Sequence, residues 1–310
     1  MIPHVIRYYD IIFRDPQMVW KYYRPFSFRR AQARNVFMVD GKIPHGGMFD
    51  RLKGAITVYA ISKIQDKPFR LNFIYPFDLR DYLEPNEYDW TIDDSEICYQ
   101  FPASRPVRAY GEYQNPARLY KNRHCETHFY YGYDSLDKIN AVFKTNFEWG
   151  KLYGELFRPR PRLATLIDSY KKDIGGKYIV VHLGDKVETD INPELPDSDK
   201  ADLMRQCIRQ IADLSHSSGA RVMLASDSMK FIKYATSSNS DFYVVPGTVK
   251  HIDTAGQTHE DENLKMFVDY HLIAGAEKVY NIVGPGMWAS AFSEYPAKIG
   301  QVEFERIFIK

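Results

Sequence analysis

The chain has 310 residues, which is long for one hydrophobic core and favours about two domains. Its 41 basic and 40 acidic residues leave a formal net charge of +1, which excludes bulk electrostatic attraction to nucleic acid or anionic lipid. The three cysteines are widely spaced and argue against a disulfide framework. The sequence contains no window of 18 apolar residues, so it predicts no transmembrane helix. The first 15 residues include charged side chains and do not resemble a signal peptide. These features predict a cytoplasmic protein.

The first regular pattern is a βαβ unit. Residues 35–40 and 69–73 have the composition of strands, and residues 52–63 between them show helical spacing. The first turn carries Gly46 and Gly47, so its backbone can approach a phosphate or sugar closely at a helix N-terminus. Tight turns alone account for most glycine pairs, so this signal is weak by itself.

Residues 75–157 are less regular and rich in tyrosine, which is typical both of sugar-binding clefts and of plain packing. Residues 124–128 contain potential metal ligands, but no second ligand pair follows at a matching distance, so we expect a structural role and no metal. Residues 158–161, Arg-Pro-Arg-Pro, resist helix and sheet and predict a linker. The expected domains are therefore residues 1–157 and 158–310.

The second domain alternates regularly between helical and strand patterns. The expected helices cover residues 161–173, 198–217, 228–235, 261–274 and 289–299, and the expected strands cover residues 178–181, 221–225, 242–245, 278–283 and 306–309. Such alternation predicts a doubly wound parallel sheet of the α/β class.

Polar residues follow three of these strands, in residues 182–190, 226–228 and 284–293. Because the carboxyl ends of parallel strands share one edge of a sheet, we expect the three groups to meet there. Hydroxyl and backbone N–H groups at a helix start suit a phosphate, and a strand-end aspartate suits a ribose hydroxyl or a base edge. The alternatives are a solvated loop for the first group and helix N-caps for Asp227 and Ser290.

The polar groups also resemble a known family. Residues 182–190 resemble the His-Val-Arg-Arg-Thr-Asp-Lys-Val block of the α-1,6-fucosyltransferases and the related rhizobial chitooligosaccharide fucosyltransferases, with two residues missing between His and Asp. Residues 225–228, 268–273 and 290–293 are similar to three further segments of that family, in the same order. Residues 46–54 resemble the glycine-rich first turn of the wider fucosyltransferase group.

The resemblance implies a GT-B glycosyltransferase with two Rossmann-like domains facing across a cleft. Such an enzyme is inverting and metal-independent, needs no cofactor, and uses GDP-fucose as donor. By position in the motifs, the resemblance assigns His182 and Asp269 to the guanine, Asp227 to the base or ribose, Asp185 and Lys186 to the sugar diphosphate, and Ser290 to a phosphate. The further candidates for binding the donor are Ser228, Ser293, Gly46 and Gly47.

The sequence departs from the family at one important place. Leu183-Gly184 replaces the arginine pair that would neutralise the leaving diphosphate. Arg51 or Lys53, beside the glycine turn, is expected either to substitute for that pair or to lie on a solvated helix face. Asp190, Glu188 and Asp50 are candidate catalytic bases, and the sequence does not rank them.

We therefore expect a fucosyltransferase that transfers fucose to a glycan acceptor in bacterial polysaccharide or glycan synthesis. The alternatives are a catalytically silent GDP- or glycan-binding protein on the same scaffold, which the missing arginines favour, and a transferase that uses another sugar nucleotide. Acceptor determinants are expected in residues 75–157.

Overall fold

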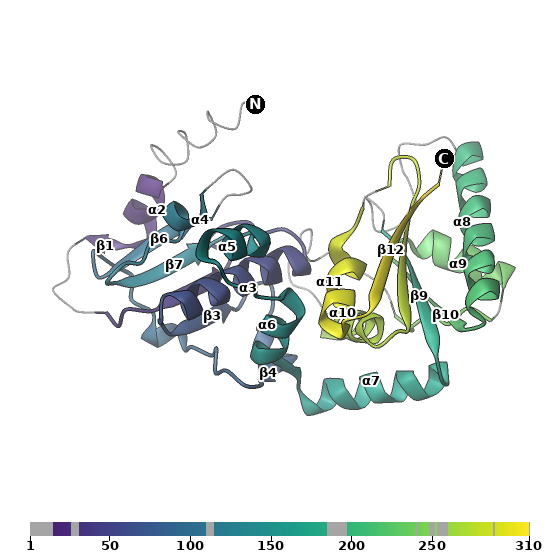
Figure 1. Ribbon diagram of the computed structural model, residues 1–310, viewed down its shortest axis with the longest axis horizontal. Coiled ribbons are helices and arrows are strands. Elements are labelled where there is room, and N and C mark those ends of the chain that lie inside the picture. Colours follow the sequence, from purple (N-terminus) through teal and green to yellow (C-terminus); the bar gives the residue numbers. More distant parts are fainter. Residues whose placement is uncertain are drawn as a thin grey trace. The chain divides into compact units, whose positions relative to one another are not determined.

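The structure is a computed structural model. It describes residues 15–25, 31–109, 115–184, 197–239, 241–247, 252, 260–287 and 289–309. The chain divides into two compact units, each shown in Figure 1. Unit 1 comprises Met1–Arg80 and Glu84–Arg158, and unit 2 comprises Asp81–Leu83 and Pro159–Lys310. In the described part of the chain, no helix has the length and apolar character needed to cross a membrane.

Unit 1 is built on a parallel four-stranded sheet. Its strands lie in the order β3 (Phe69–Phe73), β2 (Asn35–Val39), β7 (Glu126–Tyr130) and β6 (Ser104–Arg108). The predicted βαβ unit is confirmed as β2, α3 (Met48–Ile64) and β3. Helix α3 is buried on most sides, because it contacts the sheet and also α5 (Leu136–Phe143) and α6 (Trp149–Leu156).

Unit 1 also contains shorter elements, some of which extend across the boundary between the units. They are β1 (Arg24–Pro25) paired with β5 (Gln100–Phe101), β4 (Leu83–Pro85) paired with β8 (Phe157–Pro159), α4 (Pro116–Leu119), and the 3-10 turns Leu79–Asp81 and Asp94–Glu96.

A buried polar network lies on one face of β7. Tyr23, just after α2 (Asp15–Tyr22), hydrogen-bonds through its hydroxyl to His128 Nδ1 at 2.7 Å. His128 Nε2 contacts Glu126 Oε1 at 2.7 Å, and Arg34 Nε donates to Glu126 Oε2 at 2.7 Å. These partners give the histidine segment a structural role. Within the described ranges, no group of three or more His, Cys, Asp and Glu side chains is arranged to hold a metal ion.

Unit 2 is a Rossmann-like half. Its parallel sheet has the order β10 (Arg221–Ser226), β9 (Tyr178–Leu183), β11 (Lys278–Val283) and β12 (Glu303–Phe308). Residues 242–245 were expected to form a strand, but among the described residues they form only an isolated parallel bridge from Tyr243 to Met223. The first strand in sequence is thus central, with later strands added on both sides.

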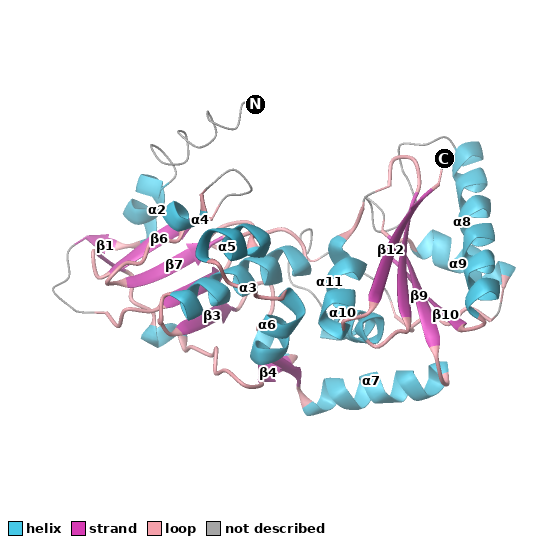
Figure 2. Cartoon of the chain, in the orientation of Figure 1, coloured by secondary structure: helices cyan, strands magenta, loops and turns pink. Residues whose placement is uncertain are grey.

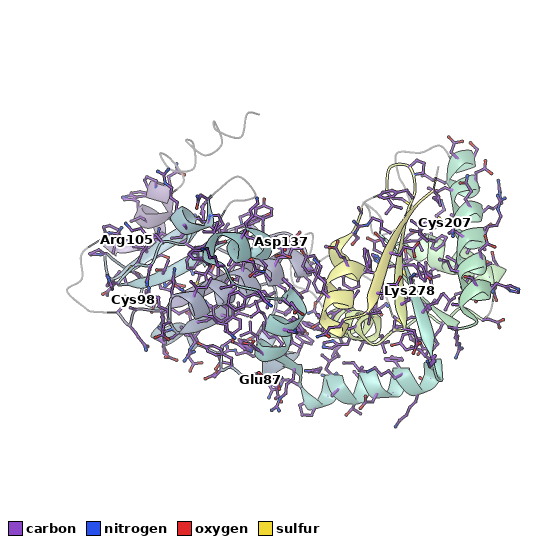
Figure 3. The ribbon with its side chains drawn as sticks, in the orientation of Figure 1. Glu87, Cys98, Arg105, Asp137, Cys207 and Lys278 are labelled. Carbon is purple, nitrogen blue, oxygen red and sulfur yellow. The ribbon has the colours of Figure 1, made fainter. Side chains whose placement is uncertain are left out.

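Helices cover both faces of this sheet, as Figure 2 shows. On one face, α8 (Asp197–Ser218) contributes Cys207 and Ile211, and α9 (Met229–Ser238) contributes Phe231, to the core cluster that contains Val181 and Leu224. Cys207, labelled in Figure 3, is fully buried there. The other face is covered by α10 (Glu260–Ala274) and α11 (Ala291–Gly300), and α7 (Pro161–Ile174) packs against α10. The α/β class with parallel sheets is confirmed.

Glycine allows two segments of unit 1 to touch. A Cβ at Gly54, in the buried part of α3, would lie 2.4 Å from Phe37 Cζ and 3.0 Å from Gly132 Cα. In contrast, nothing lies within 4 Å of a Cβ at Gly154 in α6.

We expect Gly54→Ala to lower the free energy of unfolding by roughly 1–3 kcal/mol, because overpacking outweighs the gain in helix propensity. Gly154→Ala is the matched control and should be neutral or stabilising by up to about 1 kcal/mol. Chemical denaturation of both variants tests this, and equal stability changes would contradict the packing argument.

Candidate functional site

The carboxyl edge of the unit 2 sheet contains a topological switch point. From β9 the chain first continues to β10 on one side, and β11 is later added on the other side. In open α/β sheets, a crevice forms where neighbouring strands lead away in opposite directions. Gly184 follows β9 and Gly284 follows β11 at this point.

A row of three polar side chains crosses the sheet near this edge. His182, Asn281 and Arg306 are register neighbours on β9, β11 and β12. Asn281 Nδ2 donates to the His182 carbonyl at 3.1 Å, and Arg306 Nε donates to Asn281 Oδ1 at 2.9 Å. We refer to these residues as the polar row. The sequence analysis identified His182 but missed the other two.

The N-terminus of α11 contacts the polar row. Ser290 caps the helix, since its Oγ accepts from Phe292 N at 3.1 Å. Ser293 Oγ lies 3.1 Å from His182 Nδ1. Arg306 Nη2 donates to the Ser290 carbonyl at 3.3 Å. The structure therefore brings together three residues proposed from the sequence: His182, Ser290 and Ser293.

Leu183 and Gly184, which follow His182 in the motif, are used for packing. Leu183 is fully buried in the core beneath α8. A Cβ at Gly184 would lie 2.6 Å from Ser290 Cβ, a distance that real side chains do not adopt. The absence of a side chain at Gly184 is thus what allows the start of α11 to lie against the end of β9.

The imidazole of His182 is neutral near pH 7. Its exposure is 4%, and burial, reinforced by the nearby positive charge of Arg306, lowers its pKa to about 4. The ring of Phe292 lies beside it, with centroids 5.7 Å apart. A neutral histidine can donate one hydrogen bond and accept another, which suits contact with a polar ligand.

Asp227 and Ser228 follow β10 at the same edge of the sheet. Ser228 is fully buried, and its Oγ accepts from Phe231 N at 3.1 Å, so it caps α9. Its own N–H donates to Ser226 Oγ at 3.1 Å. Asp227 is half-buried. The capping role considered for Asp227 therefore belongs to its neighbour.

Asp269 lies on α10 and is 5% exposed. Its Oδ2 forms an ion pair with Lys265 Nζ at 2.7 Å. Its Oδ1 is buried and has no hydrogen-bond partner among the described residues. Burial raises the pKa of this carboxyl, and Lys265 opposes the rise. An unpaired buried carboxylate oxygen is costly, and a ligand with N–H donors would remove that cost.

In unit 1, Gly46 and Gly47 precede α3, as the sequence predicts. Arg51 is 3% exposed, and it donates from Nε to the Gly46 carbonyl at 2.9 Å and from Nη1 to the Tyr75 carbonyl at 2.8 Å. Arg51 therefore holds two turns together and is not on a solvated face. Asp50, a candidate base, forms an ion pair with Lys53 at 2.9 Å.

His45, which the sequence analysis did not select, lies in the same turn. Burial, together with the positive charge of Arg51, lowers its pKa to about 4. The ring is stacked on Tyr131, with centroids 5.7 Å apart, and its buried Nε2 makes no hydrogen bond with any described residue. The unpaired ring nitrogen of a neutral imidazole can donate or accept one hydrogen bond, depending on the tautomer.

Four residues proposed from the sequence lie outside the described residues: Asp185, Lys186, Glu188 and Asp190.

Comparison with known proteins gives structural matches only. No protein-family model matches the chain, and no curated protein sequence does. A mutant of Arabidopsis thaliana FUT1 in complex with GDP matches with a TM-score of 0.59 and 10% identity, over 98% of this chain and 78% of that one. NodZ α-1,6-fucosyltransferase soaked with GDP-fucose matches with a TM-score of 0.55 and 13% identity, over 86% of this chain and 93% of that one.

NodZ from Bradyrhizobium, in its selenomethionine form, gives the same TM-score of 0.55 at 13% identity. The chain therefore has the GT-B fold of these fucosyltransferases. At such low identity, the match shows the fold and leaves the function to be argued from the site.

The contact between Gly184 and Ser290 can be tested with a double-mutant cycle. Gly184→Ala should destabilise the protein by roughly 1–3 kcal/mol through overpacking. Ser290→Gly alone should cost only a few tenths of a kcal/mol, since glycine is tolerated at an N-cap. Because the second change removes the clashing Cβ, we expect the double variant to recover much of the loss in chemical denaturation. Strict additivity would show that the two residues do not clash.

The burial of His182 predicts a dependence of stability on pH. Its folded pKa is about 4, below the ordinary value of 6.5, so the unfolded chain binds the proton first. The contribution of neutral His182 to the stability of the folded protein is complete above pH 6.5 and is lost as the pH falls towards 4. Between pH 7 and pH 5, His182 should account for a loss of about 2 kcal/mol in the free energy of unfolding.

Denaturant titrations at both pH values check this, with His182→Gln as the comparison. The variant will be less stable at pH 7, but its stability should fall less on acidification. An unchanged pH dependence would mean that the pKa of His182 does not differ between the folded and unfolded states.

Proposed function

We propose that the chain is a glycosyltransferase, and more narrowly an inverting, metal-independent fucosyltransferase that uses GDP-fucose and a glycan acceptor. The observation that carries the proposal is the polar row beneath the serine-capped N-terminus of α11, at the switch point of unit 2. The similarity of the fold to FUT1 in complex with GDP and to NodZ soaked with GDP-fucose supports the choice of donor.

The start of α11 suits a phosphate of the donor. Backbone N–H groups and the helix dipole favour an anion at a helix N-terminus. The Ser290 hydroxyl accepts a hydrogen bond from Phe292 N, and its own hydrogen stays available for a phosphate oxygen. His182, held neutral beside Ser293, adds polar contacts without adding charge.

Asp269 is suited to recognising the guanine base. Guanine presents adjacent N–H donors on its pairing edge, and a carboxylate accepts such a pair in parallel. The buried Oδ1 of Asp269 lacks a partner among the described residues. Uracil and adenine do not present the same pair of donors, so this carboxylate would favour GDP over UDP and ADP.

The proposed reaction is a single displacement. An acceptor hydroxyl oxygen attacks the anomeric carbon of fucose from the face opposite the diphosphate, and a new C–O bond forms as the bond to the phosphate oxygen breaks. The electron pair of that bond leaves with GDP, and the hydroxyl proton passes to a base. Preorganised N–H donors and cations lower the barrier by stabilising the charge that develops on the diphosphate.

A specific observation favours a second candidate, a catalytically silent GDP- or glycan-binding protein. Leu183 and Gly184 are committed to packing, so neither position of the missing arginine pair offers a charge. Both candidate proteins are expected to bind GDP, but only the transferase is expected to turn over GDP-fucose.

Isothermal titration calorimetry with GDP, UDP and ADP tests the donor class. We expect selective binding of GDP by the wild-type protein. Asp269→Asn, which keeps the shape but removes the charge, should weaken GDP binding about tenfold or more because it loses a charge-assisted hydrogen bond. Asp202→Asn, at an exposed aspartate on α8, is the matched control and should bind GDP as the wild type does.

Release of GDP from GDP-fucose in the presence of chitooligosaccharides then separates the two candidates. Turnover supports the transferase, and selective binding without turnover supports the silent protein. Equal or absent binding of the three nucleotides would contradict both.

A further inference from the structure

The leaving diphosphate needs a positive charge, and the two positions that carry arginines in the resembling family hold packing residues here. We propose that Arg306, on the last strand of unit 2, supplies this charge by binding the diphosphate of the donor. The inference rests on the proposed function. In the resembling family the arginines that neutralise the diphosphate follow the histidine at the end of β9, whereas here we assign that role to a residue of β12.

Arg306 is held in a fixed position next to the start of α11. Its Nε donates to Asn281 Oδ1 at 2.9 Å, and its Nη2 donates to the Ser290 carbonyl and to Glu294 Oε2, each at 3.3 Å. These contacts come from a strand and a helix, so they fix the plane of the guanidinium. The group is therefore preorganised beside the N-cap that would receive a phosphate.

Part of the guanidinium is unused. Nη1 makes no hydrogen bond with any described residue, and the side chain is 25% exposed. An arginine fork that is anchored through Nε and Nη2 can still direct N–H donors from Nη1 to a phosphate oxygen.

The local charge remains positive despite one carboxylate. Glu294 accepts from Arg306 and also lies 3.1 Å from Lys298 Nζ, so it is shared between two cations. Arg306 is connected through Asn281 to His182, so its charge lies close to the switch point. A diphosphate at the start of α11 would compete with Glu294 for this guanidinium.

The same packing explains why the charge comes from another strand. An arginine at position 184 has no room, because a Cβ there would lie 2.6 Å from Ser290 Cβ. That close approach is also what brings the Ser290 carbonyl and Glu294 into contact with Arg306. The arrangement that excludes the family's arginine is the one that positions Arg306.

The test is calorimetric titration with GDP, GMP and guanosine, which separates diphosphate from base binding. Arg306→Gln should weaken GDP binding about tenfold or more and leave guanosine binding nearly unchanged, because a charge-assisted contact to phosphate is lost. Arg306→Lys should bind GDP with intermediate affinity. Lys278→Gln removes the same charge at the opposite, amino end of β11 and should leave GDP affinity unchanged.

Glu294→Gln gives an independent prediction with the opposite sign. Removing the competing carboxylate should strengthen GDP binding and leave guanosine binding unchanged. Thermal unfolding of each variant establishes that it is folded, and if Arg306→Gln does not fold, Glu294→Gln decides the question.

Three results would each overturn the inference: Arg306→Gln binds GDP with wild-type affinity, Arg306→Gln loses GDP and guanosine binding equally, or Glu294→Gln shows no gain in GDP affinity. Arg306 would then have only a structural role, connecting β12 to α11. Failure of the wild-type protein to bind GDP would overturn the proposed function as well, so the two failures are distinguishable.

Discussion

The close contact between Gly184 and Ser290 is the constraint on which the candidate site depends. It allows the N-terminus of α11 to lie against the end of the central strand β9. Ser293 then reaches His182, and the Ser290 carbonyl reaches Arg306. Any side chain at position 184 would push the helix away, and these contacts would be lost together. The absence of a Cβ at one position thus organises contacts from three strands and a helix.

A second feature of unit 2 is that its buried polar groups are only partly satisfied. The side-chain amide of Asn281 donates to the His182 carbonyl and accepts from Arg306 Nε, which links the three residues of the polar row. By contrast, Asp269 keeps one oxygen without a described partner, although Lys265 neutralises the carboxylate. Native proteins keep few such atoms, and an unsatisfied buried group in a ligand-binding fold is a natural point of contact for a ligand.

The fold was largely predictable from the sequence, whereas the site was predictable only in part. Alternating helical and strand patterns predicted the parallel α/β sheet, because burial on both faces leaves long apolar runs. The motif that begins at His182 pointed to the end of β9. Asn281 and Arg306 escaped notice because each is one polar residue within a strand pattern, and only the register of β9, β11 and β12 aligns them. Register is a tertiary property that no local pattern contains.

Electrostatic roles were harder to predict than positions. Arg51, next to the glycine turn, was expected either to substitute for the missing arginine pair or to lie on a solvated helix face, but its guanidinium donates to two backbone carbonyls. Arg306 looked like an ordinary residue of a closing strand, yet it keeps one nitrogen unused beside a helix N-terminus. What separates the two arginines is exposure: Arg51 is 3% exposed, whereas the side chain of Arg306 is 25% exposed and its Nη1 makes no hydrogen bond with any described residue. A cation that is buried by the fold has less to offer a ligand, so a side chain that could bind an anion is better sought by its exposure and its remaining donors than by its proximity in sequence.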